Sequence, residues 1–147
     1  MRIKSFRFDD HRTDWHLEET KFDAFNLLVG VSGAGKTKIL EALRRVCRIA
    51  TEGEYNPGQV EWAIEFEQGG QTYRWHGKTE ATGVEGYLES EASNDVEVVT
   101  RIIYERVDSN AGILIERDVK KFLFEGKELP KLKRIASAIS LLEDEKR

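Results

Sequence analysis

An octapeptide near the start of the chain, Gly30–Thr37, limits the possible folds more than any other segment. It reads GVSGAGKT, with two glycines flanking four residues and a lysine and a threonine after them. This is the pattern of a phosphate-binding loop, in which successive backbone N–H groups point inward around a phosphate chain. Glycines permit the dihedral angles and the close approach that such a loop requires. The octapeptide therefore predicts a phosphate-binding site.

The sequence on either side supports this prediction. The apolar run Phe25–Val29 precedes the octapeptide and indicates a short strand buried on both faces. After the glycines, apolar residues recur at spacings of three and four, which predicts a helix from about Lys36 to about Ala50. The positive end of that helix would face a bound anion. We therefore expect a strand, a phosphate loop and a helix in succession.

The loop positions have distinct expected roles in nucleotide binding. Lys36 would bring a positive charge to the β- and γ-phosphates and is the catalytic candidate, while the Thr37 hydroxyl would ligate Mg²⁺. ATP and Mg²⁺ are therefore the expected cofactors. The other cofactor-binding residues expected in the loop and at the start of the helix are Gly30, Ser32, Gly33, Ala34, Gly35 and Lys38.

Most of the remaining chain shows the alternation of β-strands. Strand-forming segments are Met1–Phe8, Trp15–Glu19, Val60–Phe66, Thr72–His76, Val96–Val107, Ile113–Asp118 and Lys120–Leu129. Gly69-Gly70 predicts a hairpin turn between the third and fourth of these. Residues 86–90 could form another strand, and Lys131–Glu145 has the spacing of a final helix.

Composition narrows the class of protein. The chain has 147 residues, of which 39% are hydrophobic and 34% charged, as in one ordered globular domain. The net charge of −4 argues against a globally basic nucleic-acid binder. Cys47 is the single cysteine, so an internal disulfide is excluded. No segment approaches the roughly 20 apolar residues that span a bilayer, and we expect a cytoplasmic protein without membrane contact.

Phosphate binding alone does not complete nucleotide hydrolysis, which also needs a carboxylate near Mg²⁺. Glu116 and Asp118 follow an apolar run, but this run reads as a hairpin strand with charged ends. Glu143–Glu145 also follow apolar residues, but these residues lie on a helical period. The sequence therefore predicts a chain that binds a triphosphate without cleaving it unaided.

Two segments carry a resemblance to a known family. IKSFRF, from Ile3, and NLLVGVSGAGKTKILEAL, from Asn26, resemble the N-terminal half of the ABC-type ATPase head of SMC, RecF-like and OLD-like proteins. The later part, from Ile102 to Leu132, is similar to ATPases of bacterial antiphage defence systems. The resemblance is specific for residues 1–45 and loose afterwards.

The resemblance implies an α/β fold, in which a mixed sheet surrounds the P-loop helix and an antiparallel β lobe is attached. Residues 1–147 would form a single N-terminal ATPase lobe. Its P-loop core would comprise about 1–52 and 131–147, and its antiparallel region about 58–130. Arg7 matches a Phe-Arg position that lies near the nucleotide in related heads, and the other reading is a surface arginine on a strand.

The resemblance also implies partners and an activity. A second ATPase head would complete the site, as a homodimer or a larger oligomer, and a nuclease or other effector subunit and DNA are further expected partners. The Walker B carboxylates and the signature motif would come from absent chain or from a partner. ATP hydrolysis would then require that completion, and DNA repair or antiphage defence is the expected setting. The charged end at LLEDEKR is what a truncated chain would show.

Two other functions stay open. The chain could be a nucleotide-dependent binding or regulatory module, in which ATP holds an interface together and turnover is negligible. It could also be a small P-loop kinase, although such kinases alternate strands and helices throughout, whereas this sequence has a long β region after its first helix.

Overall fold

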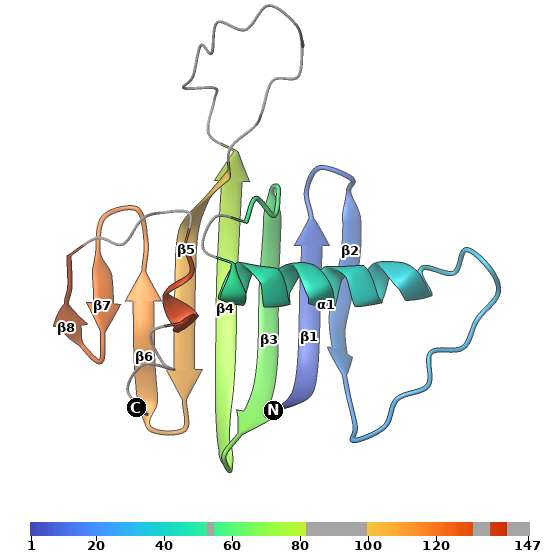
Figure 1. Ribbon diagram of the computed structural model, residues 1–147, viewed down its shortest axis with the longest axis horizontal. Coiled ribbons are helices and arrows are strands. Elements are labelled where there is room, and N and C mark those ends of the chain that lie inside the picture. Colours follow the sequence, from blue (N-terminus) through green and yellow to red (C-terminus); the bar gives the residue numbers. More distant parts are fainter. Residues whose placement is uncertain (53–54, 82–99, 131–135, 141–147) are drawn as a thin grey trace, which may run out of the picture.

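The protein is built around one antiparallel sheet that carries a single long helix on one face (Figure 1). The computed structural model describes residues 1–52, 55–81, 100–130 and 136–140. The eight strands lie in the order β2-β1-β3-β4-β5-β6-β7-β8. Their bounds are β1 Arg2–Asp10, β2 Trp15–Lys21, β3 Val60–Gln68, β4 Gln71–Ala81, β5 Thr100–Ser109, β6 Gly112–Arg117, β7 Phe122–Phe124 and β8 Lys127–Glu128. The helices are α1, Lys36–Thr51, and the short 3₁₀ helix η1, Ala138–Ser140.

The sheet has one buried and one open face because its central strands alternate apolar and charged residues. Phe6 and Phe8 of β1 point to the buried face and are fully buried. Trp62 of β3 and Trp75 of β4 pack edge to face there, with ring centroids 5.2 Å apart. These aromatic side chains form much of the hydrophobic core.

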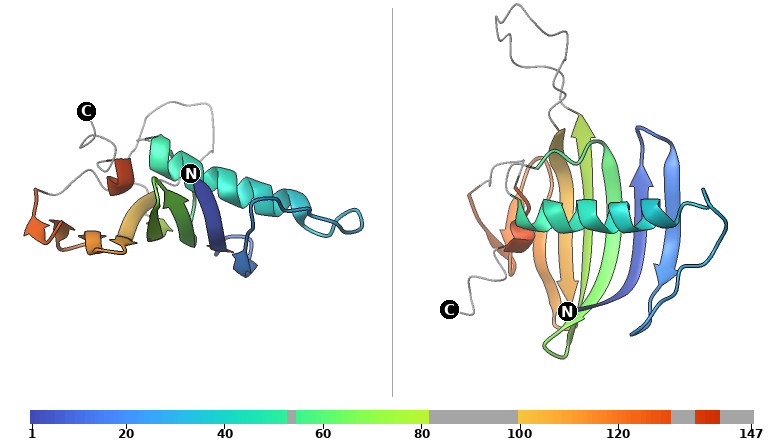
Figure 2. Two further views of the ribbon diagram at one scale, coloured as in Figure 1. Left: turned by 90° about the horizontal axis from the view of Figure 1, so that it is seen from below. Right: turned by 45° about the vertical axis from the view of Figure 1, so that its right-hand side comes forward.

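Helix α1 covers the buried face and crosses several strands (Figure 1). Ala42, Val46 and Ile49 lie on one side of the helix and are buried against the sheet. Arg45, on the same helix, places Nη1 2.6 Å from Oδ2 of Asp10 at the end of β1. Figure 2 shows that η1 lies on the same side of the sheet as α1, and η1 contacts α1.

The expected α/β class, with a mixed sheet around the P-loop helix, is wrong. Every strand pairing in the described residues is antiparallel. The predicted buried strand Phe25–Val29 lies in an irregular segment instead, and its Phe25 side chain is 82% exposed. The physical reason is that β2 and β3 take both edges of β1, so the run has no place beside β1, and it does not pair with the free edge of β2 either.

The two regions expected within the single lobe, the P-loop core and the antiparallel region, share one sheet in the described residues. β1 and β2, from the first region, are continuous with β3 and β4 through the pairing of β1 with β3. One core therefore serves the described chain.

Several local predictions are confirmed. The first two strands, the hairpin β3–β4 with its turn at Gly69-Gly70, and the helix after the octapeptide all form where expected. The suggested strand at 86–90 lies outside the described residues, as does most of the predicted helix over 131–145. The described part of that segment, 136–140, contains η1 rather than an α-helix. Among the residues described, none of the helices has the length and apolarity to cross a membrane.

Candidate nucleotide-binding site

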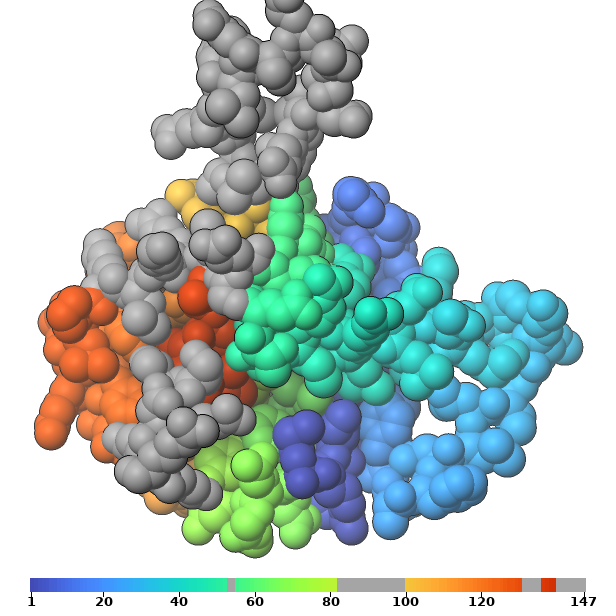
Figure 3. Space-filling model, viewed as in Figure 1, coloured from blue at the N-terminus to red at the C-terminus, as the bar shows by residue number. Residues whose placement is uncertain are grey.

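The octapeptide forms an open loop that leads directly into α1. Gly33 and Gly35 have φ angles of 83° and 85°, a region that residues with a Cβ rarely adopt. The Ala34 N–H donates to the Val31 carbonyl, 3.2 Å away, and makes a turn within the loop. Figure 3 shows the light-blue segment between β2 and α1 standing out from the body of the molecule. The loop therefore has the positive φ angles for which glycine is suited, and most of its residues are exposed to solvent.

Lys36 is held inside this loop by its own backbone. The half-buried Lys36 side chain donates from Nζ to the carbonyl oxygens of Gly30 and Val31, at 2.7 and 2.8 Å. The Lys36 side chain thus reaches from the first turn of α1 back to Gly30, where the loop begins. A bound phosphate would offer the ammonium group a charged acceptor in place of two neutral carbonyls. A hydrogen bond to a charged acceptor is stronger than one to a neutral carbonyl.

The start of α1 is electrostatically suited to an anion. Gly35 stands at the N-cap and provides no side-chain hydrogen bond, and the first turn holds no acidic residue. The first N–H groups of a helix have no partner within the helix, so they are available to an external acceptor. The side chains of Ser32, Thr37 and Lys38 are exposed around this helix start. The structure therefore brings together the predicted residues Gly30, Ser32, Gly33, Ala34, Gly35, Lys36, Thr37 and Lys38.

Arg7, the remaining predicted residue, is not brought to the loop. Its neighbours Phe6 and Phe8 point to the face that α1 covers, so Arg7 points to the open face. There, Nη2 lies 2.8 Å from Oδ2 of Asp9 and 3.7 Å from Oε1 of Glu61. Arg7 thus occupies the position of a surface arginine on a strand, the second of the two readings that the sequence allowed.

A metal at this loop would depend mainly on ligands from outside the described chain. Within the described ranges, no group of three or more His, Cys, Asp or Glu side chains is placed to hold a metal. The exposed Thr37 hydroxyl fits one position of a Mg²⁺ ion that takes its other ligands from phosphates and water.

The two carboxylates considered for hydrolysis have other partners. Glu116 on β6 pairs with Lys121 and Arg106, whose nitrogens lie 3.4 and 3.7 Å from its oxygens. The Asp118 carboxylate accepts the backbone N–H of Lys121 and closes a turn after β6. Glu116 lies on β6 and Asp118 directly follows it. Figure 1 shows β6 on the other side of the sheet from the segment that leads into α1. Glu143–Glu145 lie outside the described residues.

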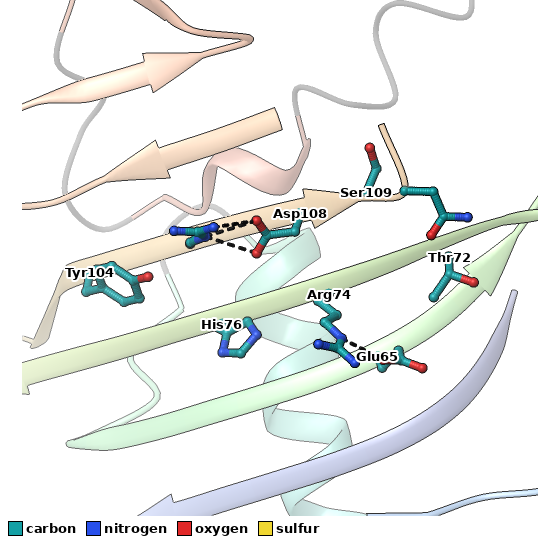
Figure 4. A pocket seen from close by; sticks show the side chains of 9 residues that line it. Glu65, Thr72, Arg74, His76, Tyr104, Asp108 and Ser109 are labelled. Carbon is teal, nitrogen blue, oxygen red and sulfur yellow. Dashed lines mark hydrogen bonds and ion pairs between the residues drawn. The ribbon is translucent and has the colours of Figure 1, made fainter. Parts of the chain in front are cut away.

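A second candidate site is a hollow of about 740 Å³ on the open face of the sheet (Figure 4). Arg74, His76 and Arg106 line it. However, Arg74 Nε lies 2.7 Å from Glu65 Oε2, and Arg106 Nη2 lies 2.8 Å from Asp108 Oδ1. Because each guanidinium already has a carboxylate partner, an anion would have to displace an ion pair, so this hollow is the weaker candidate.

The sequence analysis did not single out this hollow. Its signal is charged residues of opposite sign at alternate positions of β3, β4 and β5, facing one another across the strands. That pattern is also typical of any solvated sheet face, so it does not point to a ligand.

An apolar surface lies beside the phosphate loop. In this otherwise charged protein, large apolar side chains stand exposed on the segment that leads into the loop. Those exposed by more than 70% are Phe25, Leu27, Val29 and Val31. A contiguous exposed apolar segment of this kind marks an interaction surface more often than isolated exposed side chains do.

Comparisons with known proteins identify no family for this chain, so the function is argued from the site alone. The sequence matches no protein-family model, and it has no significant match among curated proteins. The resemblance to ABC-type ATPase heads therefore stays a prediction that rests on the residues of β1, the loop and α1.

Proposed function

We propose that the chain is an ATP-binding module that holds ATP and Mg²⁺ in the loop Gly30–Thr37. One observation carries this proposal: the GVSGAGKT loop opens α1 with the Lys36 ammonium inside it and no competing cap at Gly35. Backbone N–H groups of the loop and of the first turn would bind the β-phosphate. Lys36 would then turn from the carbonyls to the phosphates, and Thr37 would contact Mg²⁺.

We further propose that hydrolysis needs a second polypeptide surface. Phosphoryl transfer needs a carboxylate near the metal, whereas Glu116 and Asp118, the two described carboxylates considered for this role, lie at β6 and have other partners. The exposed apolar segment beside the loop supports a partner at this place, because burying it would remove apolar area from water. By the resemblance, this partner is a second ATPase head, with DNA or a nuclease-like effector coupled to it in DNA repair or antiphage defence. The protein would bind ATP and Mg²⁺ in the cytoplasm.

Calorimetric titration of the chain with ATP and Mg²⁺ tests the binding step. Lys36→Ala removes the charge at the phosphates, and a hydrogen bond to a charged group is worth about 1.5–3 kcal/mol, so the Kd should rise about 10- to 150-fold. Lys127→Ala, an exposed lysine on β8, is the matched control and should leave the Kd unchanged. Failure of the folded wild-type chain to bind ATP, or equal affinity of the Lys36→Ala variant, would contradict the proposal.

A nucleotide-dependent assembly module is the second candidate function. The exposed apolar segment favours it, since a loop that orders on ATP binding could present or withdraw this surface. Turnover separates the two candidates. If ATP promotes association, and phosphate release stays absent in the assembled complex, the module is regulatory. If release begins in that complex, the module belongs to an ATPase.

A further inference from the structure

A charged cluster is buried between the sheet and the segment 136–140, at the end of α1 away from the loop. Its centre is Glu105 on β5, whose side chain is fully buried, and Arg117 on β6 lies beside it with 6% of the residue exposed. Arg117 Nε lies 2.8 Å from Glu105 Oε2, as an ion pair without hydrogen-bond geometry. Two charged groups are thus enclosed within an otherwise apolar face.

The segment 136–140 supplies much of the hydrogen bonding in this cluster. Glu105 Oε2 accepts the backbone N–H of Ala138 at 2.9 Å, and Oε1 accepts the Ser137 hydroxyl. Arg117 Nη2 donates to the carbonyl oxygen of Ala136 at 2.6 Å. From the sheet itself, Trp75 Nε1 donates to Glu105 Oε1 at 2.9 Å. The segment therefore docks through three directional bonds to two charged side chains.

This kind of docking differs energetically from apolar packing. Removing two charges from water is costly, and their attraction and hydrogen bonds mainly offset that cost. If the segment lifted away, water could solvate the carboxylate and the guanidinium again. The docked position is therefore specific but stabilised by little net free energy, which is the property of a contact that can open while the sheet remains folded.

The docked segment also touches the helix that carries the loop. Ala138 is fully buried in the same core as Val46 and Ile49 of α1, and η1 contacts α1. The phosphate loop begins at the other end of this single helix of 16 residues. A shift of α1 on the sheet when the loop closes on a ligand would change the contacts of η1.

We propose that residues 136–140 are a releasable latch, docked on Glu105, whose opening responds to ATP bound at the opposite end of α1. The response to ATP rests on the proposed function, whereas the latch itself rests only on the Glu105 cluster. The chain after β8 would in this way sense whether the phosphate loop is occupied.

Amide hydrogen exchange of the full chain tests the latch. The amides of Ala138 and Ile139, which donate to Glu105 and to the Ser137 hydroxyl, should exchange through a local opening, faster than the amides of β4. Ser137→Ala removes one bond to Glu105 and should speed the exchange of the Ala138 amide about fivefold to tenfold. The Ile139 amide is not read in this variant, because it loses its own acceptor. Ser109→Ala, in the β5–β6 turn, is the matched control and should leave the exchange of Ala138 unchanged. Exchange of the wild-type Ala138 amide as slow as that of the β4 amides, or unaltered exchange of Ala138 in Ser137→Ala, would overturn the latch.

The coupling is tested in the same samples with ATP and Mg²⁺ added. Calorimetry first establishes saturation, and the exchange rate at Ala138 should then change by at least about fivefold, the lower end of typical allosteric coupling. ATP binding with unchanged exchange would overturn the coupling and leave the proposed function intact. Absence of ATP binding would overturn the coupling together with the proposed function, while the effect of Ser137→Ala would still decide the latch.

Discussion

The two ends of α1 lie in opposite environments. At the N-terminal end, the loop and the segment before it are exposed, with Phe25 and Val31 at 82% and 80%. At the C-terminal end, Ile49 is buried and η1 packs against the helix. The free energy of folding should therefore come from the sheet and the C-terminal part of the helix. The loop is left free to close on a ligand, as expected for segments of low local stability.

This difference also explains how a loop with the phosphate-binding sequence pattern can open a helix on a sheet that is not of the expected class. The loop needs a helix start and glycines, both of which are local features of the sequence. It does not need the strand before it to be paired, and here Phe25–Val29 is irregular while α1 remains anchored by its own buried side.

The largest expected effect compares the same substitution in the two environments. Phe8→Ala removes a fully buried ring from the core and should lower the free energy of unfolding by about 3–5 kcal/mol. Phe25→Ala removes a ring that is 82% exposed and should change it by less than about 0.5 kcal/mol. Urea unfolding of both variants measures the difference. A large loss in Phe25→Ala would mean that the loop segment is packed in solution and would break the comparison.

Two glycines provide the next comparison. A Cβ on Gly77 of β4 would lie 2.0 Å from Cζ2 of Trp62, so Gly77→Ala should cost about 1–3 kcal/mol of stability by overpacking. A Cβ on Gly33 would meet nothing within 4 Å, and only its φ of +83° opposes alanine. Gly33→Ala should therefore cost about 1 kcal/mol, because the exposed loop can relax.

For ATP binding, the order of the two glycine variants should be the reverse of their order in stability. Gly33→Ala should weaken ATP binding, because the loop loses its shape, while folded Gly77→Ala should bind as wild type does. Calorimetry beside urea unfolding separates the two quantities. The comparison fails if Gly77→Ala impairs binding more than Gly33→Ala.

Local features of the fold could be predicted from the sequence, and the sheet could not. Alternation placed β1 and the hairpin β3–β4, and the spacing of apolar residues placed α1, because these signals reside in short windows. The apolar run Phe25–Val29 carries the same signal as a buried strand, but burial depends on a neighbour that no local pattern specifies. The mixed sheet, which the resemblance implies and which this run would join as a buried strand, is wrong for that reason.

The site shows the same division. The loop residues from Gly30 to Lys38 follow from one motif and lie together. Arg7 was placed by resemblance, and the pleat of β1 directs it to the open face. Glu105 was missed because a charged residue on a strand is usually solvated. Its signal is the shared alternation phase with buried Val107, which places a carboxylate on the apolar side.

The smallest expected effect concerns two histidines, one on the edge strand β2 and one on β4 in the middle of the sheet. Burial lowers the pKa of His76 on β4 below its usual 6.5. The hydrogen bond to Asp9 raises the pKa of His16 on β2, the edge strand before the loop, above 6.5. Below pH 6.5 the unfolded chain takes up a proton at position 76 more readily than the folded chain, so His76 disfavours folding in acid. His16 has the opposite sign, and its stabilisation is lost as the pH rises through its raised pKa.

Replacing each histidine by asparagine removes its titration, so each variant shows the effect of one histidine on the pH dependence of stability. Between about pH 8 and pH 5, the range in which histidines change charge, the His76→Asn variant should lose less stability than the wild-type chain. The His16→Asn variant should lose more over the same range. Urea unfolding at both ends of this range measures the two differences. Changes of stability in the same direction in both variants would contradict this prediction. They would show that His16 at the edge of the sheet and His76 at its centre have the same electrostatic environment.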